Sequence, residues 1–414
     1  MKSTDHLPGR HVLSRRTALQ LAMAAAAGTM LPATFASSRK KAAAAGPFEQ
    51  IDGLAAALIG DGITPGVSLA VMRAGTLLHA KGYGSANLET RTPVTPETVF
   101  RVGSVSKQFI AAAIALLAED GKLGYDDPLS RYLPLFPRAG DITLRQMVTH
   151  TSGLGNYTET QPRAAFFRQA RTDYNDADLL AAMANTTPLF KSEPGTAWAY
   201  SNTAYVLLGL VVQVVAGEPY GAFLRRRLFE PAGMTQTAVD DAADVVAHRA
   251  SGYSAKPTSQ PGVAGGVRNA EYISMSYPGA AGAMRASASD LCRWHAALLG
   301  GRIVKPETLA VMLTPARLKN GELPPMPLPP DAPQDSKPQP LKYGFGVFLG
   351  DAEGRGYVEH DGGIFGFVSL LRTFQAEQVT VAVLVNYDGF DSPAKLQRIH
   401  GLRDAAARTA MTAG

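Results

Sequence analysis

The sequence predicts an α+β fold: one antiparallel β-sheet, flanked by N- and C-terminal helices and interrupted by a large all-helical insertion. Three observations support this prediction. A helix and a hairpin pattern open the folded region, helices and loops occupy about residues 122–340, and strand patterns with a final helix close the chain. The composition, 46% hydrophobic and 18% charged, is that of a folded chain.

Residues 1–36 have the layout of a secretory signal. Arg15 and Arg16 precede a short, alanine-rich apolar run at 18–31. The paired arginines resemble the twin-arginine export pattern, with Sec export and an N-terminal membrane anchor as alternatives. Residues 37–46 are expected to be a linker. We therefore expect a protein that is exported to the periplasm or secreted, with no transmembrane helix in the mature chain.

Charge and cysteine content exclude several classes of function. The net charge is +5, and it falls to +2 without residues 1–36, so no broad basic field is available for nucleic acid. The single cysteine, Cys292, rules out an intramolecular disulfide. The eight histidines are scattered without metal-ligand spacing, so neither a metal nor another cofactor is expected.

The first part of the folded region predicts a helix, a hairpin and a second helix. Apolar residues at helical spacing predict the first helix over 48–59. Strands over 67–72 and 76–82 flank a short turn and predict the hairpin. A long apolar stretch predicts a helix over 104–120, which a glycine ends.

The middle of the chain predicts helices and loops. Residues 143–146 and 287–290 match the capping box, in which two side chains satisfy backbone N–H groups at a helix start. Apolar helices are predicted over 203–216 and 291–299. The proline-rich residues 322–340 predict a surface loop.

The end of the chain predicts four strands and a helix, separated by polar or glycine-containing turns. The strands are expected at 343–349, 357–360, 365–374 and 379–386, and the helix at 393–407. These elements predict a domain over 47–410, with an α/β part at 47–121 and 341–410 and a helical part at 122–340.

Ser104 and Lys107 form an SxxK motif at the start of the predicted helix over 104–120. A serine hydroxyl needs a neighbouring base, and residues three apart share a helix face. Burial and the positive end of a helix both lower the pKa of a lysine. The backbone N–H of Ser104, at the helix start, can face a developing oxyanion. SxxK also occurs at 37–40 and 38–41, so the apolar helix after Ser104 distinguishes this copy.

Tyr200 and Asn202 form the one Tyr-x-Asn of the chain, on a loop before an apolar helix. Beside a lysine cation, a phenol can lose its proton below its usual pKa of about 10 and exchange protons with Ser104 or a leaving group. Asn202 offers an amide to substrate or to Lys107. Taken alone, the segment is equally consistent with a packed tyrosine and an N-cap asparagine.

His360 and Gly362 form the one His-x-Gly of the chain. Side chains alternate along a strand, so His360 and Asp361 are expected to face opposite ways. Gly362 and Gly363 allow a substrate to approach the backbone closely. Taken alone, His360 is more typical of a structural histidine.

Together the three motifs resemble the β-lactamase and penicillin-binding-protein superfamily, in its class C β-lactamase branch. Tyr200 follows Ser104 by 96 residues, and His360 follows Tyr200 by 160. Residues 149–154 resemble another recurrent stretch of the family, in which we expect His150 to be structural. The branch includes D-Ala-D-Ala carboxypeptidases, D-aminopeptidases and β-lactamase-like esterases. The resemblance covers nearly all of the chain after the linker and implies a β-lactamase/transpeptidase-like fold.

The resemblance also implies a covalent acyl-enzyme on amide or ester bonds. Ser104 would attack a carbonyl, Lys107 and Tyr200 would shuttle protons, and the N–H groups of Ser104 and Gly363 would hold the oxyanion. No cofactor is implied, and oligomeric state is not indicated. The residues expected to contact substrate or oxyanion are Asn202, His360, Gly362 and Gly363.

The third motif departs from the family's usual Lys-Thr-Gly. His360 is mostly neutral at neutral pH, whereas that lysine supplies a fixed positive charge. The sequence therefore favours a D-amino-acid peptide or a small acyl ester as substrate. A class C-type β-lactamase and a slowly deacylating β-lactam or muropeptide sensor are the alternatives. A Ser-His-Asp hydrolase is disfavoured, because the chain has no GxSxG elbow.

Overall fold

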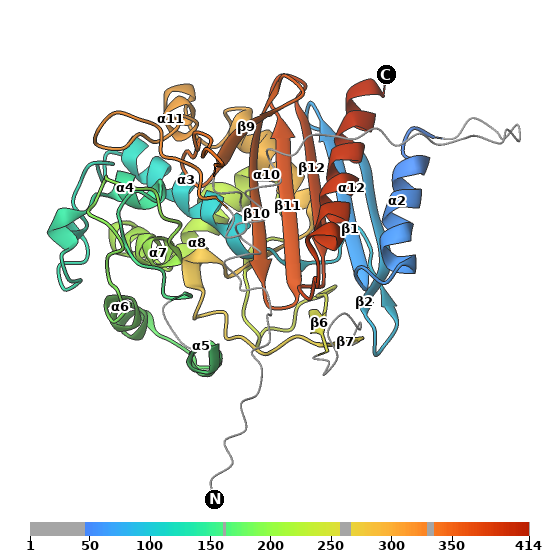
Figure 1. The fold of residues 1–414 in the computed structure, drawn as a ribbon, viewed down its shortest axis with the longest axis horizontal. Coiled ribbons are helices and arrows are strands. Elements are labelled where there is room, and N and C mark those ends of the chain that lie inside the picture. The colour runs from blue at the N-terminus through green and yellow to red at the C-terminus, as the bar shows by residue number, and fades with distance from the viewer. Residues whose placement is uncertain (1–45, 160–162, 257–265, 329–334, 414) are drawn as a thin grey trace, which may run out of the picture.

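The computed structural model describes residues 46–159, 163–256, 266–328 and 335–413 (Figure 1). The predicted signal, and all of the predicted linker except Gly46, lie outside these residues. Export therefore stays a prediction.

A seven-stranded antiparallel sheet forms the centre of the fold, in the order β3-β2-β1-β12-β11-β10-β9 (Figure 1). Strand β1 pairs with β2 on one side and with β12 on the other, so the N-terminal hairpin joins the C-terminal meander. This confirms the prediction of one sheet built from both ends of the chain. The strands and the two terminal helices are β1 (Gly66–Arg73), β2 (Thr76–Asn87), β3 (Thr92–Pro93), β9 (Phe348–Ala352), β10 (Arg355–Ile364), β11 (Phe367–Phe374), β12 (Val379–Val385), α2 (Glu49–Gly60) and α12 (Pro393–Thr412).

The sheet separates two hydrophobic clusters, because consecutive side chains of a strand point to opposite faces. Leu69 pairs with Val383, and both belong to the cluster under α2 and α12. The next pair, Ala70 and Ala382, belongs to the larger cluster on the other face. Figure 1 shows α2 and α12 together over one face, as the sequence predicted for the terminal helices.

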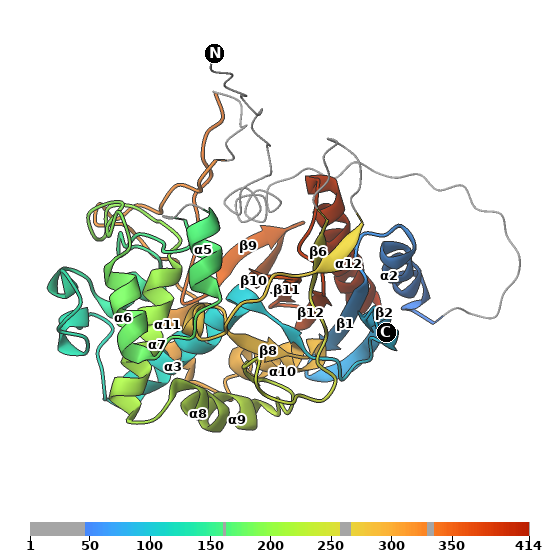
Figure 2. The ribbon, with the colours of Figure 1, turned by 90° about the horizontal axis from the view of Figure 1, so that it is seen from below.

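Helices α3, α8 and α10 and strand β8 lie on the other side of the sheet from α2 and α12 (Figure 2). A 3-10 turn, Gly103–Val105, leads into α3, which packs against α7. The helices are α3 (Ser106–Glu119), α4 (Leu144–Val148), α5 (Arg163–Ala170), α6 (Asp176–Ala184), α7 (Asn202–Ala216), α8 (Tyr220–Leu224), α9 (Glu230–Ala232), α10 (Ala288–Leu299) and α11 (Pro306–Met312). The short strands are β4 (Phe100–Arg101), β5 (Ala238–Val239) and β8 (Met284–Ala286), which form a three-stranded sheet, and the pair β6 (Tyr253–Ala255) and β7 (Val267–Asn269).

Helix α10 belongs structurally to the sheet, although its residues lie within the predicted helical part. It packs against β1 and β12. Cys292 on this helix is fully buried, with its Sγ 3.5 Å from the carbonyl oxygen of Ala70. The second face of the sheet is therefore covered by a helix from the insertion.

The predicted strand over 343–349 is wrong for residues 343–347. Regular pairing as β9 starts only at Phe348. Gly346 has a φ of 70° and lies against the carbonyl of Lys107, where a Cβ would come within 2.9 Å of the oxygen. The chain turns there to pack on α3, which breaks the extended pattern.

Among the described residues, no single helix combines the length and the apolar composition needed to cross a membrane. Helix α7 and the helical segment after it pass that test only as a pair bent by 78°.

Removing the ring of Phe109 is expected to destabilise the fold. The side chain is fully buried on α3, with ring centroids 5.1 Å from Phe229 and 4.8 Å from Trp294. We expect Phe109→Ala to lower the free energy of unfolding by about 3–5 kcal/mol, through lost burial and a residual cavity. Urea unfolding measures this, with Leu135→Ala as control because Leu135 is 85% exposed. Equal losses in the two variants would contradict the packing described.

Candidate active site

Ser104 lies where the 3-10 turn before α3 meets strand β10. A Cβ on Gly362 would lie 2.0 Å from the carbonyl oxygen of Val102 and 2.9 Å from the backbone nitrogen of Ser104. A Cβ on Gly103 would lie 2.9 Å from backbone atoms of Gly363. Both glycines are therefore required for the turn and the strand to touch. Ser104 itself is largely buried, with about 9% of the residue exposed.

Lys107 follows Ser104 by one helical turn, and its amine lies 3.1 Å from Ser104 Oγ. The side chain is fully buried, and burial lowers its pKa well below the usual value. Its Nζ donates to Asn202 Oδ1 at 2.7 Å and to the carbonyl oxygen of Ala281 at 2.8 Å. A neutral amine has two N–H bonds and one lone pair, so these two acceptors leave the lone pair for the Ser104 hydroxyl.

Tyr200 lies over the same amine, with Lys107 Nζ 4.8 Å from the centre of its ring. Burial raises the pKa of Tyr200 above its usual value, and the nearby Ser104 hydroxyl lowers it only in part. The phenol oxygen is buried and makes no well-formed hydrogen bond to any described residue. The expectation that Tyr200 loses its proton below its usual pKa is therefore wrong, because burial of the phenol raises its pKa.

Asn202 is held by a hydrogen-bonded chain from residues 156–159. Its backbone N–H donates to Asn156 Oδ1 at 3.3 Å, and its Nδ2 donates to Thr158 Oγ1 at 3.2 Å. Asn156 Nδ2 in turn donates to Glu159 Oε1 at 3.0 Å. Sequence reasoning missed this chain, although it follows directly after the family-like stretch at 149–154.

His150 packs beneath Tyr200, with ring centroids 4.4 Å apart. Its Nδ1 accepts the backbone N–H of Ser201 at 3.1 Å, and burial lowers its pKa well below the usual value. The rings of Trp198 and Tyr343 also contact it. His150 therefore supports the segment that carries Tyr200, consistent with the structural role expected from the sequence.

His360 forms part of an aromatic wall beside Tyr200. Its Nε2 lies 3.3 Å from the Tyr343 hydroxyl, and its Nδ1 lies 2.7 Å from the backbone oxygen of Asp361. Burial, with the nearby Lys107, lowers the pKa of His360 to about 3. The imidazole is therefore neutral at physiological pH. Phe348 contacts the same ring, with centroids 5.5 Å apart.

Asp361 faces the opposite side of β10, as strand alternation predicted. Its Oδ1 lies 4.0 Å from Arg403 Nη1, in a buried cluster of charges that includes Glu359 and Asp404. Burial and the neighbouring Glu359 raise the pKa of Asp361 to about 7. The two faces of β10 thus carry a neutral histidine and a carboxyl group that titrates near neutral pH.

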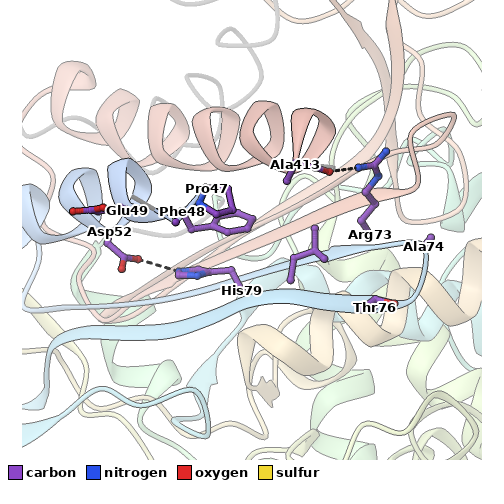
Figure 3. Close-up of a pocket in the computed structure, with 11 residues that line it drawn as sticks. Pro47, Phe48, Glu49, Asp52, Arg73, Ala74, Thr76, His79 and Ala413 are labelled. Atoms are coloured by element: carbon purple, nitrogen blue, oxygen red, sulfur yellow. Dashed lines mark hydrogen bonds and ion pairs between the residues drawn. The ribbon is translucent and has the colours of Figure 1, made fainter. Parts of the chain in front are cut away.

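A hollow of about 740 Å³ lies between the start of α2, the β1–β2 hairpin and the end of α12 (Figure 3). Phe48, Asp52, Arg73 and His79 line it. It opens on the face of the sheet that α2 and α12 cover, whereas Gly362 lies against Ser104 on the other face. It is therefore separate from the Ser104 site.

The chain belongs to the β-lactamase family, because the Beta-lactamase family model matches residues 51–405. Penicillin-binding protein 4* of Bacillus subtilis is 30% identical over 322 residues, which cover 75% of this chain and 66% of that protein. Esterase EstB of Burkholderia gladioli is 34% identical over 176 residues, 40% of this chain and 44% of the esterase. This chain thus spans about two thirds of the first relative and less than half of the second.

Solved structures agree with this assignment. The D-amino acid amidase of Ochrobactrum anthropi SV3 superposes with a TM-score of 0.72 and 25% identity, covering 88% of this chain and 98% of the amidase. The fold is therefore that of the β-lactamase/transpeptidase-like superfamily, as the three motifs indicated.

The contact between β10 and the Ser104 turn predicts that a side chain at Gly362 would destabilise the fold. We expect Gly362→Ala to lower the free energy of unfolding by about 1–3 kcal/mol, because the new methyl group meets backbone atoms that cannot rotate away. Gly356→Ala on the same strand is the control, since a Cβ there meets nothing within 4 Å. Thermal unfolding compares the two, and an unchanged midpoint in Gly362→Ala would contradict the contact.

The raised pKa of Asp361 predicts a pH-dependent effect on stability. The folded state favours the protonated carboxyl, so this contribution to stability is complete below the ordinary pKa of 3.8 and is lost as pH rises through about 7. We expect the stability of Asp361→Asn, relative to wild type, to increase from pH 5 to pH 8. Denaturant unfolding at several pH values measures this difference.

Asp126→Asn is the control for this series, because a hydrogen bond from Arg145 lowers the pKa of Asp126 and moves its titration below the range tested. A relative stability of Asp361→Asn that stays flat across the range would show that its carboxyl does not titrate there.

Proposed function

We propose that this chain is a serine hydrolase that forms a covalent acyl-enzyme at Ser104. The observation that carries the proposal is the buried amine of Lys107, whose pKa burial lowers well below its usual value. Its two N–H bonds are directed to Asn202 and Ala281, and its nitrogen lies 3.1 Å from Ser104 Oγ. A serine becomes a nucleophile when such a base takes its proton. The relatives and structural neighbours that are named hydrolases support the same class of reaction.

In the proposed reaction, Ser104 Oγ bonds to the substrate carbonyl carbon while its proton passes to Lys107 Nζ. The backbone N–H groups of Ser104 and Gly363 hold the oxyanion that forms. The bond to the leaving group then breaks, and the leaving nitrogen or oxygen receives the proton through the Tyr200 hydroxyl. A neutral phenol can donate and accept in one step, so the raised pKa of Tyr200 suits it to relay the proton.

Water then adds to the acyl carbon, and Lys107 takes the water's proton. The bond to Ser104 Oγ breaks, the serine recovers its proton, and the acid product leaves. Asn202 holds the amine in place through both steps, because its Oδ1 accepts from Lys107 while its Nδ2 is bonded to Thr158.

The proposed substrates are small acyl esters, or D-amino-acid amides and peptides. Their binding would need no fixed positive charge from the protein at the third motif. His360 stands where the family's third motif usually places a lysine, and it is neutral and packed against Tyr343 and Phe348. A neutral aromatic surface suits an uncharged acyl or side-chain group. The names of two relatives, an esterase and a D-amino acid amidase, agree with this choice.

Substituting the nucleophile and the base tests this proposal. We expect Ser104→Ala and Lys107→Arg each to reduce turnover of nitrophenyl butyrate by about 10³-fold or more. Lys107→Arg keeps a long basic side chain, but a guanidinium stays protonated and cannot accept the serine proton. Steady-state kinetics and intact-protein mass spectrometry provide the readouts, with an acyl adduct expected on wild type only. Turnover that survives in Ser104→Ala would remove Ser104 from the mechanism.

A substrate panel separates the hydrolase proposal from its alternatives. The panel holds a nitrophenyl ester, D-phenylalanine amide, a D-Ala-containing peptide and a chromogenic cephalosporin. We expect ester or D-amide turnover to exceed cephalosporin turnover. Dominant cephalosporin turnover would favour a β-lactamase. One equivalent of stable adduct without turnover would favour a sensor.

A further inference from the structure

A second cavity, of about 250 Å³, lies between the small sheet β4–β8–β5 and the start of β11. Three arginines from distant parts of the chain line it: Arg101 on β4, Arg249 on the loop before β6, and Arg285 on β8. Phe100 and Phe367 form an apolar part of the wall, with ring centroids 6.2 Å apart. None of these residues belongs to the Ser104 site.

The three guanidinium groups converge on one carboxylate. Asp240, whose side chain is 1% exposed, accepts Arg101 Nε on Oδ2 at 2.8 Å. Its Oδ1 lies 2.9 Å from Arg249 Nη2 and 3.3 Å from Arg285 Nη1. Both oxygens of Asp240 are therefore used, and three positive charges face one buried negative charge.

The neighbouring acidic residues do not remove this surplus. Asp244 is 56% exposed, and its Oδ2 lies 3.7 Å from Arg285 Nη1, so solvent screens much of its charge. Asp241 offers Arg249 its backbone oxygen, while its own Oδ1 accepts the backbone N–H of Ala243. Asp240 is thus the buried carboxylate that all three arginines share, whereas Asp241 and Asp244 are exposed, so solvent screens their charges.

Two of the arginines also keep unused buried donors. The Nε atoms of Arg249 and Arg285 are buried and form hydrogen bonds with no described residue. Buried N–H groups nearly always have an acceptor, and an unpaired one is costly. The three guanidinium groups around one buried carboxylate favour a further group with negative charge and several acceptor oxygens.

We propose that this three-arginine cavity binds a small oxyanion of the phosphate or carboxylate class. Guanidinium groups match such oxygens with paired hydrogen bonds, and the phenylalanine wall lowers the local polarity that would otherwise weaken them. Arg101 lies three residues before Ser104, and Arg285 lies four residues after Ala281, whose carbonyl accepts from Lys107. A bound oxyanion therefore joins the two segments that lead into the catalytic turn, and it stabilises the folded chain.

Titration of inorganic phosphate tests this site, with sodium chloride holding the ionic strength constant. Calorimetry gives the affinity, and thermal unfolding gives the stabilisation that binding to the folded state must produce. We expect saturable binding to wild type, and binding about tenfold weaker or worse in Arg249→Gln. Arg131→Gln is the matched control, because Arg131 forms a single ion pair with Asp127 at 3.0 Å on the surface.

A second variant is expected to act in the opposite direction. Asp240→Asn removes the carboxylate that competes for the guanidinium groups while keeping all three of them, so phosphate affinity should rise. Where Arg249→Gln does not fold, Arg249→Lys keeps the charge but loses the paired donors, and it should also bind about tenfold more weakly. Acetate and sulfate titrations then show whether carboxylates and tetrahedral anions share the site.

Three outcomes would overturn the proposal. One is the absence of saturable phosphate binding to wild type. Another is a phosphate affinity that falls in Asp240→Asn as it does in Arg249→Gln, which would make the arginines purely structural partners of Asp240. The last is chloride that stabilises the wild type as well as phosphate does at equal ionic strength.

Discussion

The burial of one amine determines how the rest of the Ser104 site can work. Lys107 is fully buried, and its described hydrogen-bond partners, Ser104, Asn202 and Ala281, are all uncharged. An ammonium ion is costly in such surroundings, since none of these hydrogen-bond partners is a carboxylate that would balance its charge. The same burial that forbids the charge creates the base, because a free amine has a lone pair and an ammonium ion does not.

Long-range packing supplies the surroundings of that amine. The first strands and helix α3 bring Ser104 and Lys107, the start of α7 brings Asn202, and the turn before β8 brings the carbonyl of Ala281. Strand β10 lies against the turn that carries Ser104, and it comes this close only because Gly362 has no side chain. The sheet order, with β1 beside β12, fixes the distance between the N-terminal and C-terminal contributions.

Much of the site could be predicted from the sequence, because it depends on residues close together in the chain. The predictions failed where tertiary contacts decide the structure. The spacing of Ser104 and Lys107 predicted their contact, because residues three apart share a helix face. The capping box at 143–146 is complete, whereas at 287–290 only Ser287 caps the helix. There the Asp290 carboxylate instead accepts from Gln236 and Thr237, about fifty residues earlier in the chain. The prediction about the proton of Tyr200 failed for a similar reason. The rings that bury Tyr200 come from distant parts of the chain, so the residues next to it in the sequence do not reveal its burial.

The arginine cavity shows how an argument from total charge can miss a local site. A near-neutral chain lacks the broad positive field that holds nucleic acid, and that inference concerns long-range potential. Recognition of a small oxyanion depends instead on a few donors within hydrogen-bond distance, shielded from water. Arg101, Arg249 and Arg285 are far apart in the sequence, and the fold alone brings them to Asp240. The two places respond differently to burial. It lowers the pKa of the lone Lys107, whereas the three partly buried arginines around Asp240 keep their positive charges.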